Sequence, residues 1–127
     1  MDAGVVMIIL TLLSGGEVSS TFVNVDTRAE CNERLSRIRP VLESGDVQLK
    51  EAGCFDSSVQ FDDFDHSMPQ DVPRYSFLVS IDGERALIQK HKSAADCQTS
   101  LEILPTATAG QANYCTTSTQ DLIVQGG

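Results

Sequence analysis

Residues 27–38 read TRAECNERLSRI and residues 93–104 read SAADCQTSLEIL, and the two stretches align without a gap. Each begins with Thr or Ser and has an acidic residue three places later. This pattern is typical of a helix N-terminus, because the hydroxyl accepts a hydrogen bond from a first-turn N–H and the carboxylate favours the positive end of the helix dipole. An apolar face follows at i, i+4 and i+7, formed by Cys31, Leu35 and Ile38 in the first stretch and by Cys97, Leu101 and Leu104 in the second. The sequence therefore predicts two similar helices, each with a cysteine in its first turn.

The same order of elements surrounds both predicted helices. Residues 75–81 alternate in the half-buried strand pattern, Asp82-Gly83 is a hairpin signal, and residues 85–90 read as the return strand. A short strand at 111–115 follows the second helix and ends in a cysteine. The first half has matching segments at 5–13, 18–25 and 47–54.

These matches predict an α+β fold made of two repeated ββαβ units. We expect the units to pack with pseudo-twofold symmetry, with an antiparallel sheet, helices on one face and one disulfide per unit. The alternative is two ordinary β–α units whose cysteines coincide by chance.

The expected domain boundaries follow from the repeat. Residues 1–54 form the first unit, residues 55–73 an acidic linker, and residues 74–127 the second unit with a polar tail. The linker carries five aspartates and no Lys or Arg. The linker also contains three phenylalanines, Phe55, Phe61 and Phe64. These are expected to pack against the core and to fix parts of the linker there. In the tail, residues 122–124 are apolar and are expected to pair at a sheet edge.

The apolar run at residues 5–13 has two interpretations. Continuous Val, Ile and Leu before a Gly turn are typical of a strand that is buried on both faces, and such a strand is expected to lie centrally. Alternatively, residues 1–16 are a signal peptide, although they contain Asp2 and no basic residue. The repeat favours the strand, because cleavage near Gly16 would remove the first strand of the first unit.

Four cysteines in a short chain favour a disulfide framework, which requires an oxidising compartment such as a periplasm, the extracellular space or a virion surface. If each unit closes on itself, the pairs are Cys31–Cys54 and Cys97–Cys115. Free thiols would instead indicate a cytoplasmic protein. A reactive role for Cys31 or Cys97 is the weaker alternative, because both lie on the apolar helix face.

The net charge of −9 argues against a nucleic-acid partner, because Lys and Arg supply most of that affinity. No apolar run is long enough to span a membrane as a helix. An acidic protein is instead suited to a basic protein partner, and an oligomer or assembly is compatible with the sequence.

Two polar clusters are weak candidates for sites. The segment with Asp62, Asp63, Asp65 and His66 carries oxygen and imidazole groups that a divalent cation would accept, but it is more simply a solvated linker. The arginines of the first helix are Arg28, Arg34, Arg37 and Arg39. Because Glu30–Arg34 and Glu33–Arg37 have the favourable i, i+4 order, a self-paired surface explains them better than an anion site.

None of the common nucleotide-binding, hydrolase or metalloprotease motifs occurs in the sequence, and no cofactor is indicated. We therefore expect a non-enzymatic structural or binding module, as a subunit of an envelope complex or virion surface, bound to an unidentified protein partner. The alternative is a secreted acidic inhibitor of a basic enzyme such as a lysozyme or nuclease. A metal-dependent hydrolase using the acidic segment is a weaker third hypothesis.

Overall fold

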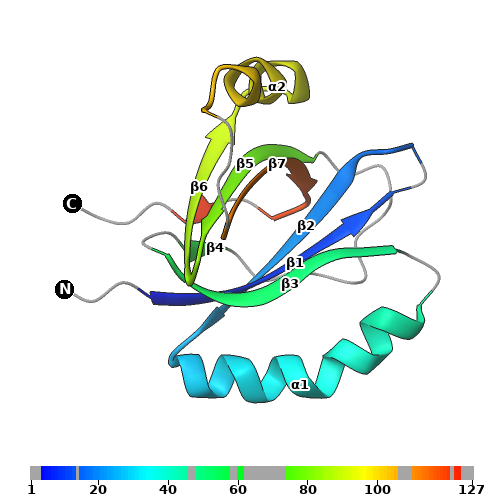
Figure 1. The fold of residues 1–127 in the computed structure, drawn as a ribbon, viewed down its shortest axis with the longest axis vertical. Coiled ribbons are helices and arrows are strands. Elements are labelled where there is room, and N and C mark those ends of the chain that lie inside the picture. Colours follow the sequence, from blue (N-terminus) through cyan, green and yellow to red (C-terminus); the bar gives the residue numbers. More distant parts are fainter. Residues whose placement is uncertain are drawn as a thin grey trace.

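Six strands form one mixed sheet that closes into a barrel, in the order β1-β2-β7-β5-β6-β3. The structure, a computed structural model, describes residues 4–13, 15–45, 48–57, 60–61, 74–105, 110–120 and 122–123. Along the chain the elements are β1 (Gly4–Leu12), β2 (Val18–Val25), α1 (Arg28–Ser44), β3 (Gln48–Ser57), β4 (Gln60–Phe61), β5 (Tyr75–Asp82), β6 (Arg85–His91), α2 (Ala94–Glu102), β7 (Gln111–Ser118) and β8 (Leu122–Ile123). The protein is therefore a small α+β domain (Figure 1).

The barrel consists of two antiparallel three-stranded sheets, β2-β1-β3 and β6-β5-β7. Two short parallel pairings join them, β2 with β7 and β3 with β6. The prediction of a purely antiparallel sheet was wrong at these two seams. Alternation along a strand predicts which faces are buried, but it does not specify which distant strand lies alongside.

Strand β1 lies between β2 and β3 and is buried on both faces, which is the role predicted for the apolar N-terminal run. Val6, Ile8 and Leu10 point into the barrel core, whereas Met7 and Ile9 belong to a second core beneath α1. Strict alternation explains this division, because successive side chains of a strand point to opposite faces. One strand thus contributes to both cores.

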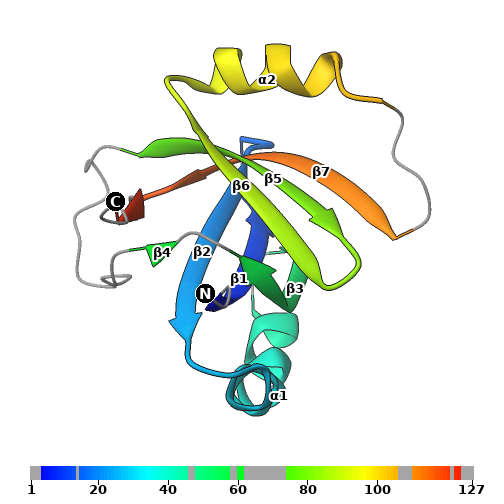
Figure 2. The same ribbon diagram turned by 90° about the vertical axis from the view of Figure 1, so that its left-hand side faces the viewer.

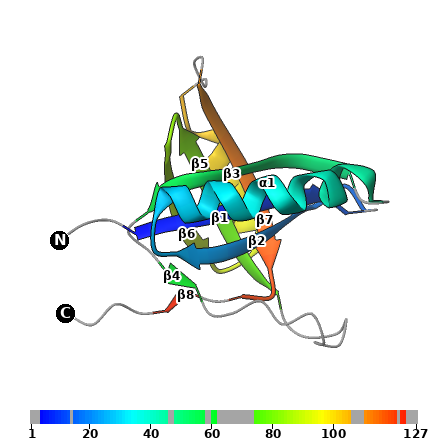
Figure 3. The same cartoon turned by 90° about the horizontal axis from the view of Figure 1, so that it is seen from below.

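The two helices both lie on the outer face of the closed sheet, on opposite sides of the barrel (Figure 2). Closure of the sheet explains their separation, because the outward faces of the two three-stranded sheets point in different directions. Helix α1 lies lengthwise over β1, β2 and β3 (Figure 3). Both N-caps are as predicted, with the hydroxyl of Thr27 accepting from the Glu30 N–H and that of Ser93 from the Asp96 N–H.

Prolines affect the two helices differently. Pro40 lies inside α1, which continues to Ser44 and is capped by Gly45. Helix α2 ends at Glu102, three residues before Pro105. Proline disfavours the α conformation in the residue before it, which fits this earlier stop. As a result α1 has 17 residues and α2 only nine.

An arginine stabilises each parallel seam. Arg28 donates to the Cys54 carbonyl at 2.8 Å and to the Glu84 carbonyl at 3.2 Å, so that it bridges β3 and the β5–β6 turn. Arg74 donates to the Ser19 hydroxyl at 2.8 Å and to the Thr117 carbonyl at 3.0 Å, so that it bridges β2 and β7. These long side chains supplement the few backbone bonds of the seams.

The segment after β3 fills one end of the barrel. Phe61 is fully buried and stacks on Phe22 with ring centroids 3.9 Å apart. The Asn24 side chain holds its backbone by accepting from the Phe61 N–H at 3.1 Å and donating to the Phe61 carbonyl at 2.6 Å. Two parts of the expected linker therefore belong to strands: residues 55–57 are the end of β3, and residues 60–61 form β4, which pairs with β8. Phe64 and Val124 lie outside the described residues.

Each disulfide forms within its own ββαβ segment. The first is Cys31–Cys54 and the second Cys97–Cys115, with Cα–Cα distances of 6.0 and 5.9 Å. This is the pairing that the repeat predicts. Each bridge joins the first turn of a helix to the last strand of its segment, and the pair is consistent with an oxidising compartment. Neither helix among the described residues is long and apolar enough to cross a membrane.

Candidate functional site

A groove of about 530 Å³ lies on the outer face of the second sheet, beside the C-terminal end of α2. Its floor consists of two rows of outward side chains across β6, β5 and β7, as the strand register shows. One row is Leu87, Ser80 and Asn113, and the other is Arg85, Asp82 and Gln111. Leu104 and Pro105, which follow α2, form its wall. We call this site the α2 groove.

The local sequence explains why the groove exists. Gly83 has a φ of +60° in the tight β5–β6 turn, a conformation that favours glycine and fixes the register of the floor. On the outward face of β5, Ser80 is small and leaves space where a larger residue would fill it. Because α2 stops at Glu102, it does not cover this end of the sheet.

Exposed aliphatic side chains gather at the groove. Leu87 and Leu104 line it and are 57% and 36% exposed, and the adjoining Ile103 is 80% exposed. Among the described residues, Val41 on α1 is the other large aliphatic side chain exposed to this degree. Exposed apolar groups that cluster beside a concave site are typical of interaction surfaces.

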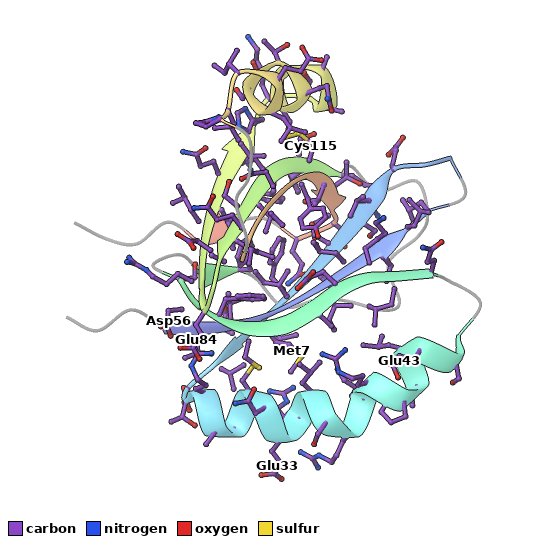
Figure 4. The ribbon with its side chains drawn as sticks, in the orientation of Figure 1. Met7, Glu33, Glu43, Asp56, Glu84 and Cys115 are labelled. Carbon is purple, nitrogen blue, oxygen red and sulfur yellow. A yellow bond between two sulfur atoms is a disulfide. The ribbon has the colours of Figure 1, made fainter. Side chains whose placement is uncertain are left out.

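Carboxylates surround the floor of the groove. Asp82 and Glu84 are exposed, and Asp56 of β3 forms a 2.8 Å ion pair with Arg28. Figure 4 shows Asp56 and Glu84 close together beside the start of α1. Arg85 is the basic residue of the lining, so the groove presents both signs of charge in a protein with a net charge of −9.

Among the described residues, the titratable groups that line the groove are Asp56, Asp82 and Arg85. His91, the histidine among the described residues, does not line it, and its Nδ1 lies 2.8 Å from Oδ2 of Asp96 in α2. The hydrogen bond with His91 holds the pKa of the Asp96 carboxyl below its ordinary value. This pair connects the end of β6 to the first turn of α2, so its role is to hold these two elements together.

A second cavity, of about 500 Å³, separates α2 from the β1–β2 turn. The Cys97–Cys115 disulfide lies in its lining, as does Tyr114, whose hydroxyl donates to Glu51 at 3.4 Å. Burial raises the pKa of the Tyr114 phenol, and the Glu51 carboxylate raises it further. The second disulfide is therefore partly accessible through Cys115, which is half-buried, although Cys97 is 0% exposed. The Cys31–Cys54 disulfide lies in the core beneath α1.

Of the two polar clusters named from the sequence, the structure describes the arginines of α1 but not the acidic segment. Asp62, Asp63, Asp65 and His66 lie outside the described residues, and the described part of the chain holds no group of three or more metal-ligating side chains. On α1, Arg37 pairs with Glu33 at 3.7 Å, as expected. Arg28 and Arg39 instead donate to carbonyls of β3, Arg39 to Ala52 at 2.9 Å. Arg34 is exposed.

Sequence reasoning missed the α2 groove. The alternation in β6 marks Leu87 as pointing to the face opposite Ala86 and Ile88, and an apolar residue on an otherwise polar face was the available signal. That signal becomes informative only with the register that places Ser80 and Asn113 beside it. Comparison with protein families, curated proteins and solved structures finds no match to this chain.

Proposed function

We propose that this protein is a non-enzymatic protein-binding module, a subunit of a larger assembly in an oxidising compartment, and that the α2 groove is its docking surface. The proposal rests on one observation, which is that the exposed side chains of Leu87 and Leu104 cluster around a groove of about 530 Å³. Contact of these apolar side chains with water does not stabilise the protein. Their burial against a partner would stabilise a complex by about 25 cal/mol per Å² of apolar area.

The proposal includes an internal duplication, with two ββαβ segments related by a pseudo-twofold axis. The pairings support it: β1 lies between β2 and β3 as β5 lies between β6 and β7, and exchange of the segments converts the β2–β7 seam into the β6–β3 seam. In register, Met7 has Val23 and Cys54 as neighbours, and the corresponding Leu78 has Gln89 and Cys115. A duplicated, cross-linked scaffold suits a rigid binding role.

Site-specific photo-crosslinking in the native source tests the docking surface. A benzophenone amino acid replaces Leu87, Leu104 or, as a control, Val41, which is 70% exposed but lies on α1. We expect a discrete protein adduct from positions 87 and 104 and none from 41. If that adduct is a basic secreted enzyme that loses activity when bound, the assembly role gives way to that of an inhibitor.

Two outcomes contradict the proposal. Equal crosslinking from all three positions, or none from positions 87 and 104, would show that the groove is not a docking surface. Turnover in a broad substrate screen that a single carboxylate substitution abolishes would show that the protein is an enzyme.

A further inference from the structure

The first ββαβ segment contains a covered counterpart of the α2 groove. In the register, the floor row Leu87, Ser80 and Asn113 corresponds to the row Thr21, Ile9 and Ala52 of the first sheet. Ile9 is only 8% exposed, because α1 packs over this row with Leu35 and, less deeply, Ile38 and Leu42. The first segment thus shows what a covered row looks like in this fold.

The helices explain why the second row is left open. The ungapped alignment of residues 27–38 with 93–104 places Leu104 at the position of Ile38. Helix α1 continues six residues beyond Ile38, to Ser44, whereas α2 has already ended at Glu102. The α2 groove therefore lies where the last turns of a longer helix would lie.

The last turns of α1 indicate the chemistry of a fitting occupant. They place the aliphatic Leu42 against the sheet, and Arg39 donates to the Ala52 carbonyl at 2.9 Å. Around the α2 groove, the exposed groups include Leu87 and Leu104 and three carboxylates, those of Asp82, Glu84 and Glu102. The exposed guanidinium of Arg85, opposite Asp82 in the strand register, leaves the groups around the groove with an excess of negative charge. An aliphatic residue and a basic residue on one helical face would complement both.

We infer that the α2 groove binds a short basic amphipathic helix of a partner protein, in the way that the last turns of α1 cover the first sheet. Its aliphatic side chain packs between Leu87 and Leu104, and its basic side chain approaches Asp82. This inference rests on the proposed docking function and adds the class of partner. The net charge of −9 favours encounter with a basic segment.

The test titrates the full-length, oxidised protein with a synthetic peptide that copies residues 34–45 of the chain itself, RLSRIRPVLESG. A second peptide carries Glu in place of the three arginines. Amide chemical shifts are followed at Leu87, Ser80, Asn113 and Val41. We expect saturable shifts at the first three positions, binding at least tenfold weaker for the acidic peptide, and weaker binding at high salt.

Variants locate the effect. Leu87→Asp should weaken binding of the basic peptide at least tenfold, and Asp82→Asn should reduce its salt dependence. Val41→Asp, which adds the same charge on α1, should leave binding unchanged. Both Leu87 and Val41 are exposed, so folding of the variants is checked by their unchanged amide spectra elsewhere.

Three results would overturn the inference. They are an absence of shifts at the groove, equal affinity for the basic and acidic peptides, and self-association of the protein that Leu87→Asp abolishes, which would make a second copy the occupant. If crosslinking from position 87 still yields a partner in those cases, the docking function stands and only the class of partner is wrong. If crosslinking also fails, the docking function is wrong as well.

Discussion

Arg28, in the first turn of α1, donates a 2.8 Å hydrogen bond to Oδ1 of Asp56 near the end of β3. The same guanidinium reaches the carbonyls of Cys54 and Glu84. Next to it, the Asp56 N–H donates to the Glu84 carbonyl at 2.8 Å. One side chain therefore connects α1, β3 and the β5–β6 turn, and it supplements the backbone pairing that closes the barrel at this point.

Replacement of Arg28 by Ala should lower the free energy of unfolding by about 2 kcal/mol, because several charge-assisted hydrogen bonds are lost in a partly exposed site. Arg28→Lys should retain only part of the stability, since an ammonium group lacks the planar fork. Urea denaturation followed by circular dichroism measures the change. Arg34→Ala, at an exposed position of the same helix, is the control and should change stability by less than about 0.5 kcal/mol. Equal effects at both positions would refute the role of Arg28.

Gln120, which follows the end of β7, should stabilise the fold as a paired strand does, because its side chain bonds both backbone groups of Phe22. Its buried amide accepts from the Phe22 N–H at 2.9 Å and donates to the Phe22 carbonyl at 2.6 Å. Gln120→Ala leaves both backbone groups without these partners, so we expect a loss of about 3 kcal/mol. Gln98→Ala, at an exposed position on α2, should have little effect in the same denaturation experiment. A Gln120→Ala variant as stable as the parent would disprove this assignment.

The two disulfides should be reduced in a fixed order. Cys115 is half-buried and lines a cavity of about 500 Å³ together with Cys97, which is 0% exposed. Cys31 and Cys54 are both buried beneath α1, at 0% and 8% exposed. Thiol attack requires access to a sulfur atom, so a dithiol should reduce Cys97–Cys115 first. Timed alkylation followed by peptide mass mapping identifies the newly freed thiols. Earlier appearance of free Cys31 and Cys54 would contradict the prediction.

The His91–Asp96 pair should add an acid-sensitive contribution to stability. Because the pKa of Asp96 is lower in the folded protein than its ordinary value, the folded state holds the carboxylate more favourably than the unfolded chain does. This contribution is complete above the unfolded-state pKa of about 3.9 and is lost as the pH falls from there through the folded pKa. Asp96→Asn should therefore destabilise the protein at pH 6 and have less effect at pH 2.5, as measured by thermal denaturation at both pH values. A Gln98→Ala control, at an exposed position of α2 without a titratable group, should have the same effect at both pH values.

Local patterns were enough to predict the order of the elements in the two ββαβ segments, although not β4. Alternation at residues 75–81 predicted β5, Asp82-Gly83 predicted its turn, and Thr27 and Ser93 predicted both helix starts. These features arise from hydrogen bonds and side-chain directions within a few residues, which a sequence states directly. Repetition of the pattern also suggested which cysteines pair.

The candidate site depended on information that is not local. Ser80, Leu87 and Asn113 are unremarkable separately, and they form a floor only because β5 pairs with β6 on one side and with β7 on the other. Pro40 and Pro105 likewise have different consequences, since α1 continues through Pro40 over an apolar sheet face whereas α2 ends before Pro105. Propensity at a proline is overridden where packing of the following turns stabilises the helix.

The sequence by itself determined the two β–β–α–β orders and the helix caps, because these follow from short-range periodicity. It favoured the strand buried on both faces, and the similarity of its two halves favoured the pairing of cysteines. Only the tertiary structure decided that the sheet closes, that the helices lie on opposite sides, that Phe61 enters the barrel and that a groove remains beside α2. These features depend on contacts such as Ser19 with Thr117 and Asp56 with Arg85. Their free energy arises only when residues far apart in the chain are brought together, and no local pattern encodes that choice.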